Sequence, residues 1–122
     1  MLRELRDVRQ IEGEHRRRWF SDAFFDLIVW VDDGGEIVGF QLCYDKESRQ
    51  RALTWKAPSH YIHTGVDDGE NRPGRYKGTP ILVADGAFDR TTIGERFRRA
   101  ATAIDPAIAE LVHAKLLAYG LT

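Results

Sequence analysis

Residues 26–56 read DLIVWVDDGGEIVGFQLCYDKESRQRALTWK, and this stretch decides the fold. Runs of apolar, β-branched and aromatic residues flank Asp33-Gly34. An Asp-Gly pair in that setting is a strong short-range signal for a β-hairpin. A polar turn at residues 46–50 then leads into a third run, RALTWK. The stretch therefore predicts three consecutive antiparallel strands.

Side chains alternate between the two faces of a sheet, so a turn assignment also assigns the faces. We expect Asp33-Gly34 to form a two-residue turn, with Val29 opposite Val38 and Leu42 opposite Trp55 in the following hairpin. The face expected to form the core carries Leu27, Val29, Val31, Val38, Phe40, Leu42 and Tyr44. The second face is expected to carry Asp26, Ile28, Trp30, Ile37, Gly39, Gln41, Cys43, Asp45, Ala52, Thr54 and Lys56.

Polar groups stand beside a tryptophan on the second face. In the expected register Asp26, Gln41 and Lys56 form one row across three strands, and Cys43 with Thr54 forms the next. A tryptophan, a glycine and polar groups on one face are suited to contacting a ligand. The sequence therefore predicts ligand-binding residues at Asp26, Trp30, Gln41, Cys43, Thr54 and Lys56.

The segments around this block give weaker signals. Residues 19–25 hold four aromatics around Ser21-Asp22, and we expect a turn that plugs the edge of the core. Residues 57–64 are a candidate fourth strand, and residues 81–83 are a short apolar one. Residues 65–79 are rich in glycine and charge, which predicts a long surface loop.

Two amphipathic helices are expected at the C-terminal end. Thr92 followed by Glu95 predicts a capping box at the start of the first helix, and Asp105-Pro106 predicts the start of the second. We expect an α+β fold, namely an antiparallel β-meander of about four to six strands with both helices packed on one face. A single domain spans residues 1–122 in this interpretation.

Composition limits the classes of function. The chain has 122 residues, a net charge of −1 and 30% charged residues, which favours neither nucleic acid nor an anionic membrane as a partner. A single cysteine, Cys43, excludes an internal disulfide and fits a reducing compartment. Residues 1–14 lack the apolar core of a signal peptide. We expect a cytoplasmic protein without a cofactor.

Several motifs are better explained without special chemistry. His60 and His63 are three residues apart, so on a strand they point to opposite faces and could not share a metal ion. We therefore expect no metal site. Cys43 is expected to be a semi-buried apolar residue rather than a nucleophile. The run Arg16-Arg17-Arg18-Trp19 mixes basic and aromatic residues, as single-strand nucleic-acid binders do.

Longer runs of the chain suggest a relationship. RRWFSD at residues 17–22, DLIVW at 26–30 and GFQLCYDK at 39–46 occur together with RALTW at 51–55 and PILV at 80–83. With these runs the chain resembles a family of small uncharacterised bacterial proteins over most of residues 5–117. Small proteins of this kind are also found in mobile integron gene cassettes. The resemblance implies a bacterial cytoplasmic protein and carries over no site residue.

The leading hypothesis is a non-enzymatic domain that binds a small ligand or another protein and acts as a homodimer. The apolar residues of the second face would be buried between two copies. One alternative is a small hydrolase-like or lyase-like enzyme using Asp26 and Lys56 as an acid/base pair. Another is a single-stranded nucleic-acid binder acting through Arg16–Arg18 and Trp19.

Overall fold

A computed structural model shows an antiparallel sheet and two C-terminal helices, which confirms the α+β fold. The structure describes residues 1–46, 50–67, 81–84 and 89–119. The strands are β1 (Arg3–Glu4), β2 (Arg16–Ser21), β3 (Phe25–Val31), β4 (Ile37–Tyr44), β5 (Arg51–Lys56), β6 (His60–Asp67) and β7 (Ile81–Ala84). The helices are α1 (Arg90–Ala100) and α2 (Pro106–Ala118).

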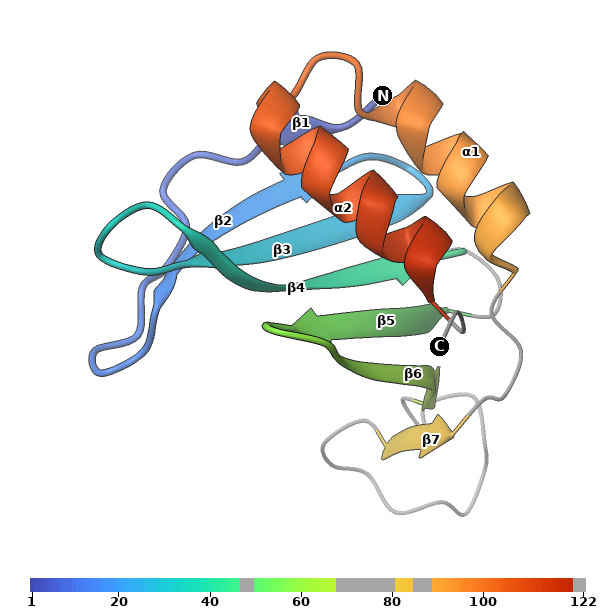
Figure 1. The fold of residues 1–122 in the computed structure, drawn as a ribbon, viewed down its shortest axis with the longest axis horizontal. Helices are drawn as coiled ribbons and strands as arrows, with labels where there is room; N and C mark the ends of the chain where they lie inside the picture. Colours follow the sequence, from blue (N-terminus) through green and yellow to red (C-terminus); the bar gives the residue numbers. More distant parts are fainter. Residues whose placement is uncertain (47–49, 68–80, 85–88, 120–122) are drawn as a thin grey trace.

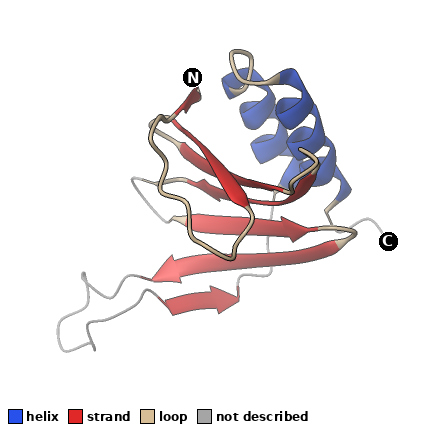
Figure 2. Ribbon diagram, turned by 90° about the vertical axis from the view of Figure 1, so that its left-hand side faces the viewer, coloured by secondary structure: helices blue, strands red, loops and turns tan. Residues whose placement is uncertain are grey.

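The strands lie in the sheet in the same order as in the chain, and every neighbouring pair is antiparallel. This is the meander that the apolar runs and turns predict, extended at both edges. Both helices lie side by side on one face of the sheet (Figure 1). The view turned by 90° shows them on the same side of the strands (Figure 2).

The core lies between that face and the helices. The side chains of β3 alternate between fully buried and half-buried positions as far as Val29. Phe25, Leu27 and Val29 are fully buried, and the residues between them are half-buried. The helices contribute Ile93 and Phe97 from α1 and apolar residues at helical spacing from α2. The core consists of Leu2, Phe20, Phe25, Leu27, Val29, Phe40, Leu42, Tyr44, Leu53, Trp55, Ile93, Phe97, Ala101, Ile104, Ile108, Val112 and Leu116.

The first hairpin has a longer turn than expected. The amide of Gly35 donates to the carbonyl of Asp32 at 3.0 Å, and the amide of Asp32 donates to the carbonyl of Glu36 at 2.9 Å. Gly35 has φ +84°, the left-handed conformation that ends a three-residue hairpin loop. The Asp32 carboxylate accepts from the amides of Gly34 and Glu36, both at 2.9 Å. The turn therefore has three residues, 33–35, instead of the expected two.

A β-bulge adds a second shift in the same hairpin. Val31 pairs with Ile37 but Trp30 pairs with Gly39, so Val38 is an extra residue in β4. Each one-residue shift reverses the faces, and the two together restore them. Only the residues between turn and bulge change sides. Ile37 packs against the core, not on the second face as expected, and Val38 lines a groove on the second face.

Other expectations at the edges also need correction. Residues 16–21 form the strand β2, which the apolar pattern did not predict. The expected turn around Ser21-Asp22 follows it, and the Asp22 carboxylate accepts from the amides of Phe24 and Phe25 at 2.8 and 2.7 Å. Phe20 and Phe25 on either side of this turn are fully buried, as expected. Helix α1 begins earlier than Thr92, because the Asp89 side chain is the N-cap and accepts from the Thr92 amide at 3.1 Å. The predicted cap of α2 at Asp105 with Pro106 in the first turn is confirmed. Residues 65–67 belong to β6, and the remainder of the expected loop, 68–79, lies outside the described residues.

Candidate functional site

The face of the sheet away from the helices carries three rows of side chains across the central strands. The first row is Trp30 of β3, Gly39 of β4, Lys56 of β5 and His60 of β6. The second row is Ile28, Gln41, Thr54 and Ile62. The third row is Asp26, Cys43, Ala52 and Thr64. All six site residues predicted from the sequence lie on this face, with two of them in each row.

A groove of about 980 Å³ lies over the first two rows. Trp30, Gln41, Thr54 and Lys56 line it, so it brings together four of the six predicted residues. Asp26 and Cys43 are not among the lining residues. The groove is lined by Gly13, Glu14, His15, Trp30, Asp33, Val38, Gly39, Gln41, Thr54, Lys56 and Ala57.

Gly39 makes the floor of this groove. It lies opposite Trp30 of β3 on one side and Lys56 of β5 on the other. The large indole ring and the long lysine side chain are therefore separated by backbone that carries no side chain. A Cβ atom at Gly39 would be 2.9 Å from the Trp55 carbonyl oxygen, which is closer than real Cβ contacts. A glycine inside a strand often marks such a close approach. The hollow therefore follows from a packing requirement of the sheet.

The walls of the groove combine different chemistries. The indole of Trp30 is half-buried and offers an apolar surface, while Lys56 is exposed. Lys56 makes no hydrogen bond or ion pair with any described residue. Gln41 and Thr54 are half-buried opposite each other and supply an amide and a hydroxyl at the adjoining row. A groove with an apolar wall and a few polar groups is typical of small-ligand sites.

The predicted row of Asp26, Gln41 and Lys56 does not form. The pairing of β3 with β4 and of β4 with β5 is each shifted by two residues from the expected register. Gln41 lies between the rows of the other two residues. Asp26 and Lys56 are thus four residues apart along the strand direction, about 13 Å at the usual rise of a strand. The two side chains cannot act as an acid/base pair.

Asp26 instead belongs to a hydrogen-bond network at the turn that connects β2 to β3. Its carboxylate accepts from the Ser21 hydroxyl at 2.6 Å and from Lys46 Nζ at 3.0 Å. Lys46 also donates to the Asp22 carbonyl at 2.8 Å. The Asp26 and Lys46 side chains are only 23% and 25% exposed, so the ion pair is partly shielded from water. Lys46, which the face assignment overlooked, is the partner of Asp26.

Cys43 is buried on the second face. Its thiol is only a weak hydrogen-bond partner for the Gln41 amide, with 3.6 Å between Nε2 and Sγ. Burial raises the pKa of the Cys43 thiol. A protonated, buried thiol is a poor nucleophile, because the thiolate is the reactive form. These properties match a small apolar residue that supports Gln41.

The segment before β2 contributes a wall that the face assignment could not include. Gly13, Glu14 and His15 line the groove although they precede the predicted sheet. A side-chain clamp at Gln10 holds the segment in place. The Gln10 amide donates to the Arg17 carbonyl at 2.9 Å, and the Arg17 amide donates to Gln10 Oε1 at 2.8 Å. One side chain thereby makes the two hydrogen bonds that a neighbouring strand would make.

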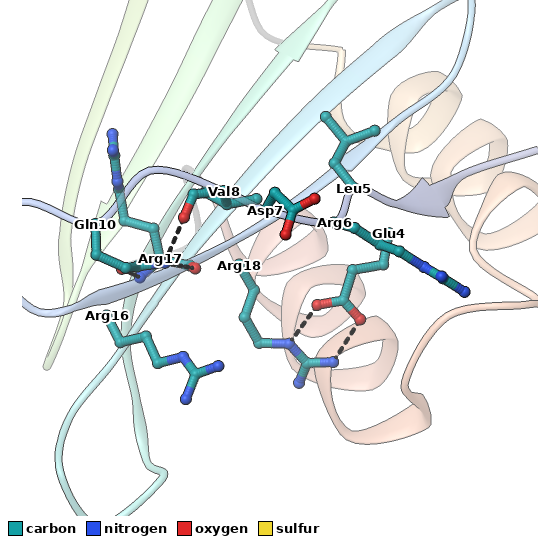
Figure 3. A pocket seen from close by; sticks show the side chains of 9 residues that line it. All are labelled: Glu4, Leu5, Arg6, Asp7, Val8, Gln10, Arg16, Arg17 and Arg18. Carbon is teal, nitrogen blue, oxygen red and sulfur yellow. Dashed lines mark hydrogen bonds and ion pairs between the residues drawn. The ribbon is translucent and has the colours of Figure 1, made fainter.

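A second hollow of about 680 Å³ lies near the basic run. It is lined by Glu4, Leu5, Arg6, Asp7, Val8, Gln10, Arg16, Arg17 and Arg18 (Figure 3). Arg18 donates to both carboxylate oxygens of Glu4 at 2.8 Å and to Asp105 at 3.2 Å. These hydrogen bonds raise the pKa of Arg18 and lower the pKa of Glu4.

The basic run does not form a continuous cationic surface. Figure 3 shows Arg17 pointing to the opposite side of β2 from Arg16 and Arg18, as the alternation of a strand requires. The guanidinium of Arg17 donates to the Arg9 carbonyl. Trp19 lies on the same face as Arg17, opposite Ile28 of β3. The charge of Arg18 is offset by two carboxylates, so the geometry gives little support to a nucleic-acid surface here.

The two histidines of β6 lie on opposite faces. His60 is exposed on the second face beside Lys56, whereas His63 is 7% exposed and forms a 2.7 Å hydrogen bond with the Tyr44 hydroxyl. The Tyr44 and His63 rings are also stacked, with 2° between their planes. His63 is therefore part of the core wall. Among the described residues no group of three or more His, Cys, Asp or Glu could hold a metal ion.

The comparisons with known proteins give no relative: no family model matches the chain, and no curated protein or solved structure matches it significantly. The resemblance to a family of small bacterial proteins therefore stays a prediction. Within the described part of the chain, neither helix is long and apolar enough to cross a membrane.

Proposed function

We propose that the protein is a non-enzymatic binding domain that takes up a small molecule in the groove above Gly39. The observation that carries the proposal is the bare backbone of Gly39 between Trp30 and Lys56. The groove, at about 980 Å³, is at the upper end of the size range of ligand pockets. Its lining offers a flat ring, an amide, a hydroxyl and an exposed cation that makes no ion pair with a described residue.

Two observations favour binding over catalysis. Asp26 is paired with Lys46, so the acid/base pair that an enzyme would need is not assembled with Lys56. Cys43 is buried, and its raised pKa keeps the thiol protonated near neutral pH. Among the described lining residues, the groove holds groups that orient a ligand, without a nucleophile activated by a base.

A library screen followed by nuclear magnetic resonance tests this proposal. Compounds that bind should shift the Trp30 indole N–H and the Gly39 amide, because these groups form the wall and floor of the groove. Binding should be lost in Trp30→Leu and kept in Trp19→Leu, which changes the same residue type on the same face outside the groove. A screen without compounds that shift these two groups would reject the proposal.

A second candidate function is association of two copies through the same face. Ile62 is 44% exposed at one end of the second row. Ile28 is half-buried at the other end next to Trp19, and Gln41 and Thr54 lie between the two isoleucines. Exposed apolar residues can mark a protein interface. A symmetric dimer through this face would bury these residues and is the homodimer expected from the sequence.

The solution mass measured by light scattering separates the two candidates. A dimer would have twice the chain mass of 14.0 kDa, and Ile62→Glu should then give a folded monomer. Leu117→Glu is the matched control, because Leu117 is 40% exposed on α2 at the other side of the sheet. A dimer that persists in Ile62→Glu would exclude this face as its interface.

We also propose a cytoplasmic location. One cysteine in the chain, buried as Cys43, suits a reducing compartment. Fractionation of cells that express the protein, followed by immunoblotting, checks this proposal. Recovery of the protein in the membrane or secreted fraction would contradict it.

A further inference from the structure

The charges along the groove narrow the class of ligand. Glu14 comes two residues before Arg16, which pairs with Val31 at the end of β3. Asp33 follows Val31 by two residues in the hairpin loop. Both acidic residues thus lie beyond Trp30 at one edge of the sheet, where Glu14 precedes the start of β2 and Asp33 follows the end of β3. Lys56 lies on β5, on the other side of Gly39 from Trp30.

The ring of Trp30 and the bare floor lie between Lys56 and the two acidic residues. Arg17, which pairs with Trp30 on β2, also lies on this face, and its guanidinium donates to the Arg9 carbonyl. Trp30 and Lys56 are two strand spacings apart, which is about 10 Å in a sheet. Glu14, Asp33 and Lys56 are all exposed, and their side chains make no ion pair with a described residue. Each charge is therefore available to a ligand.

We infer that the ligand of the groove is a zwitterion with a flat or apolar body, and this inference rests on the proposed function. Its cationic group lies toward Glu14 and Asp33, and its anionic group contacts Lys56. Its body packs on the Trp30 indole above Gly39, where Gln41 and Thr54 offer hydrogen bonds along the edge. An aromatic compound with an ammonium group at one end of its ring and a carboxylate at the other is the simplest molecule of this class.

Three benzene compounds test the charge requirement while keeping the ring constant. 4-(Aminomethyl)benzoate carries a charge at each end of the ring, 4-methylbenzylamine carries only the positive charge, and 4-methylbenzoate carries only the negative one. Binding is measured by isothermal titration calorimetry on the full chain. 4-(Aminomethyl)benzoate should bind about threefold to fivefold more tightly than either singly charged compound, the usual effect of one exposed charge contact.

Variants assign each charge to its residue. Lys56→Gln should remove the advantage of 4-(aminomethyl)benzoate over 4-methylbenzylamine and leave its advantage over 4-methylbenzoate. The double variant Glu14→Gln with Asp33→Asn should do the reverse. Two controls, Arg99→Gln and Glu110→Gln, remove exposed charges on the helices and should keep the wild-type order.

The outcomes separate this inference from the proposed function. Equal affinity for the three compounds, or no binding of 4-(aminomethyl)benzoate, overturns the zwitterion, while other compounds that shift the Trp30 and Gly39 resonances leave the groove as a binding site. A library screen without any compound in the groove overturns both. Loss of the advantage of 4-(aminomethyl)benzoate in a helix control also overturns the assignment, because the effect would then follow the net charge of the protein.

Discussion

Gly39 lies so close to the neighbouring strand that a Cβ atom at this position would be 2.9 Å from the carbonyl oxygen of Trp55. The same position is the floor of the groove between Trp30 and Lys56. The Trp55 carbonyl belongs to the backbone, so it could move away only by distorting β5. One residue therefore joins the stability of the sheet to the shape of the proposed site.

Gly39→Ala should destabilise the protein by about 1–3 kcal/mol, the usual cost of forcing an extra group into a packed region. Gly34→Ala is the matched control, because its Cβ would lie 3.4 Å from the Asp32 carboxylate, an ordinary contact at an exposed position. The control should change the free energy of unfolding by less than about 0.5 kcal/mol. Urea unfolding measures both values. Equal effects of the two substitutions would show that the close approach at Gly39 is not present.

The ion pair of Asp26 predicts different roles for two lysines. Lys46→Met should lower the free energy of unfolding by about 1–2 kcal/mol, because it leaves the partly buried Asp26 carboxylate without its charged donor. Lys56→Met removes an exposed cation that makes no ion pair within the described part of the chain, and it should change stability by less than about 0.5 kcal/mol. Thermal or urea unfolding of both variants makes the comparison. A larger loss in Lys56→Met would contradict the observed register.

The Gln10 clamp predicts local protection of the β2 backbone. In Gln10→Ala the Arg17 amide loses its acceptor, which lies at 2.8 Å, and its hydrogen exchange should become faster. Gln10→Glu keeps an acceptor for that amide and loses the donor to the Arg17 carbonyl. Arg17 should therefore be better protected in Gln10→Glu than in Gln10→Ala. Identical exchange rates in the two variants and the wild type would argue against the clamp.

The acidic partners of Arg18 predict a loss of stability in acid. Hydrogen bonds from Arg18 lower the pKa of Glu4 from its ordinary value of 4.5. The pKa of Asp105 is lowered from its ordinary value of 3.8, mainly by the hydrogen bond from the Ala107 amide and then by the one from Arg18. A carboxyl group whose pKa is lower in the folded state than in the unfolded state stabilises the fold. This contribution is fully present above the ordinary pKa, and it is lost as the pH falls through the lowered pKa of the folded state.

Urea unfolding between neutral pH and about pH 3 measures this dependence. The free energy of unfolding should fall below pH 4.5 in the wild type, with a shallower fall in Arg18→Gln because the carboxylates have lost that donor. Arg3→Gln, which changes an exposed arginine of β1, should keep the wild-type slope. An unchanged slope in Arg18→Gln would mean that other carboxylates cause the acid loss.

The fold could be predicted from the sequence because its signals are local. Alternating apolar residues fix which side chains of β3, β4 and β5 face the core, and Asp105-Pro106 fixes the start of α2. The faces stayed correct despite a two-residue error in register, because a shift by two preserves the alternation. The exchange of Ile37 and Val38 shows the limit of this argument, since a single bulge reverses the faces locally.

The site could be predicted only in part. Trp30, Gln41, Thr54 and Lys56 were found from their shared face, whereas their rows depended on the exact register. Glu14 reaches the groove through a non-local clamp, the contact of Gln10 with Arg17, for which strand periodicity gives no signal. The partner of Asp26 was missed because Lys46 lies beyond the end of β4 and approaches from the turn. Contacts of this kind depend on tertiary structure.

The most direct test of the groove as a binding site is a crystal structure of the protein with a compound taken from the library screen. We expect the compound above Gly39, with its ring on the indole of Trp30 and a polar or charged group near Lys56. A compound bound only in the hollow around Arg16 and Arg18, or a groove filled by the same face of a second copy, would contradict this account.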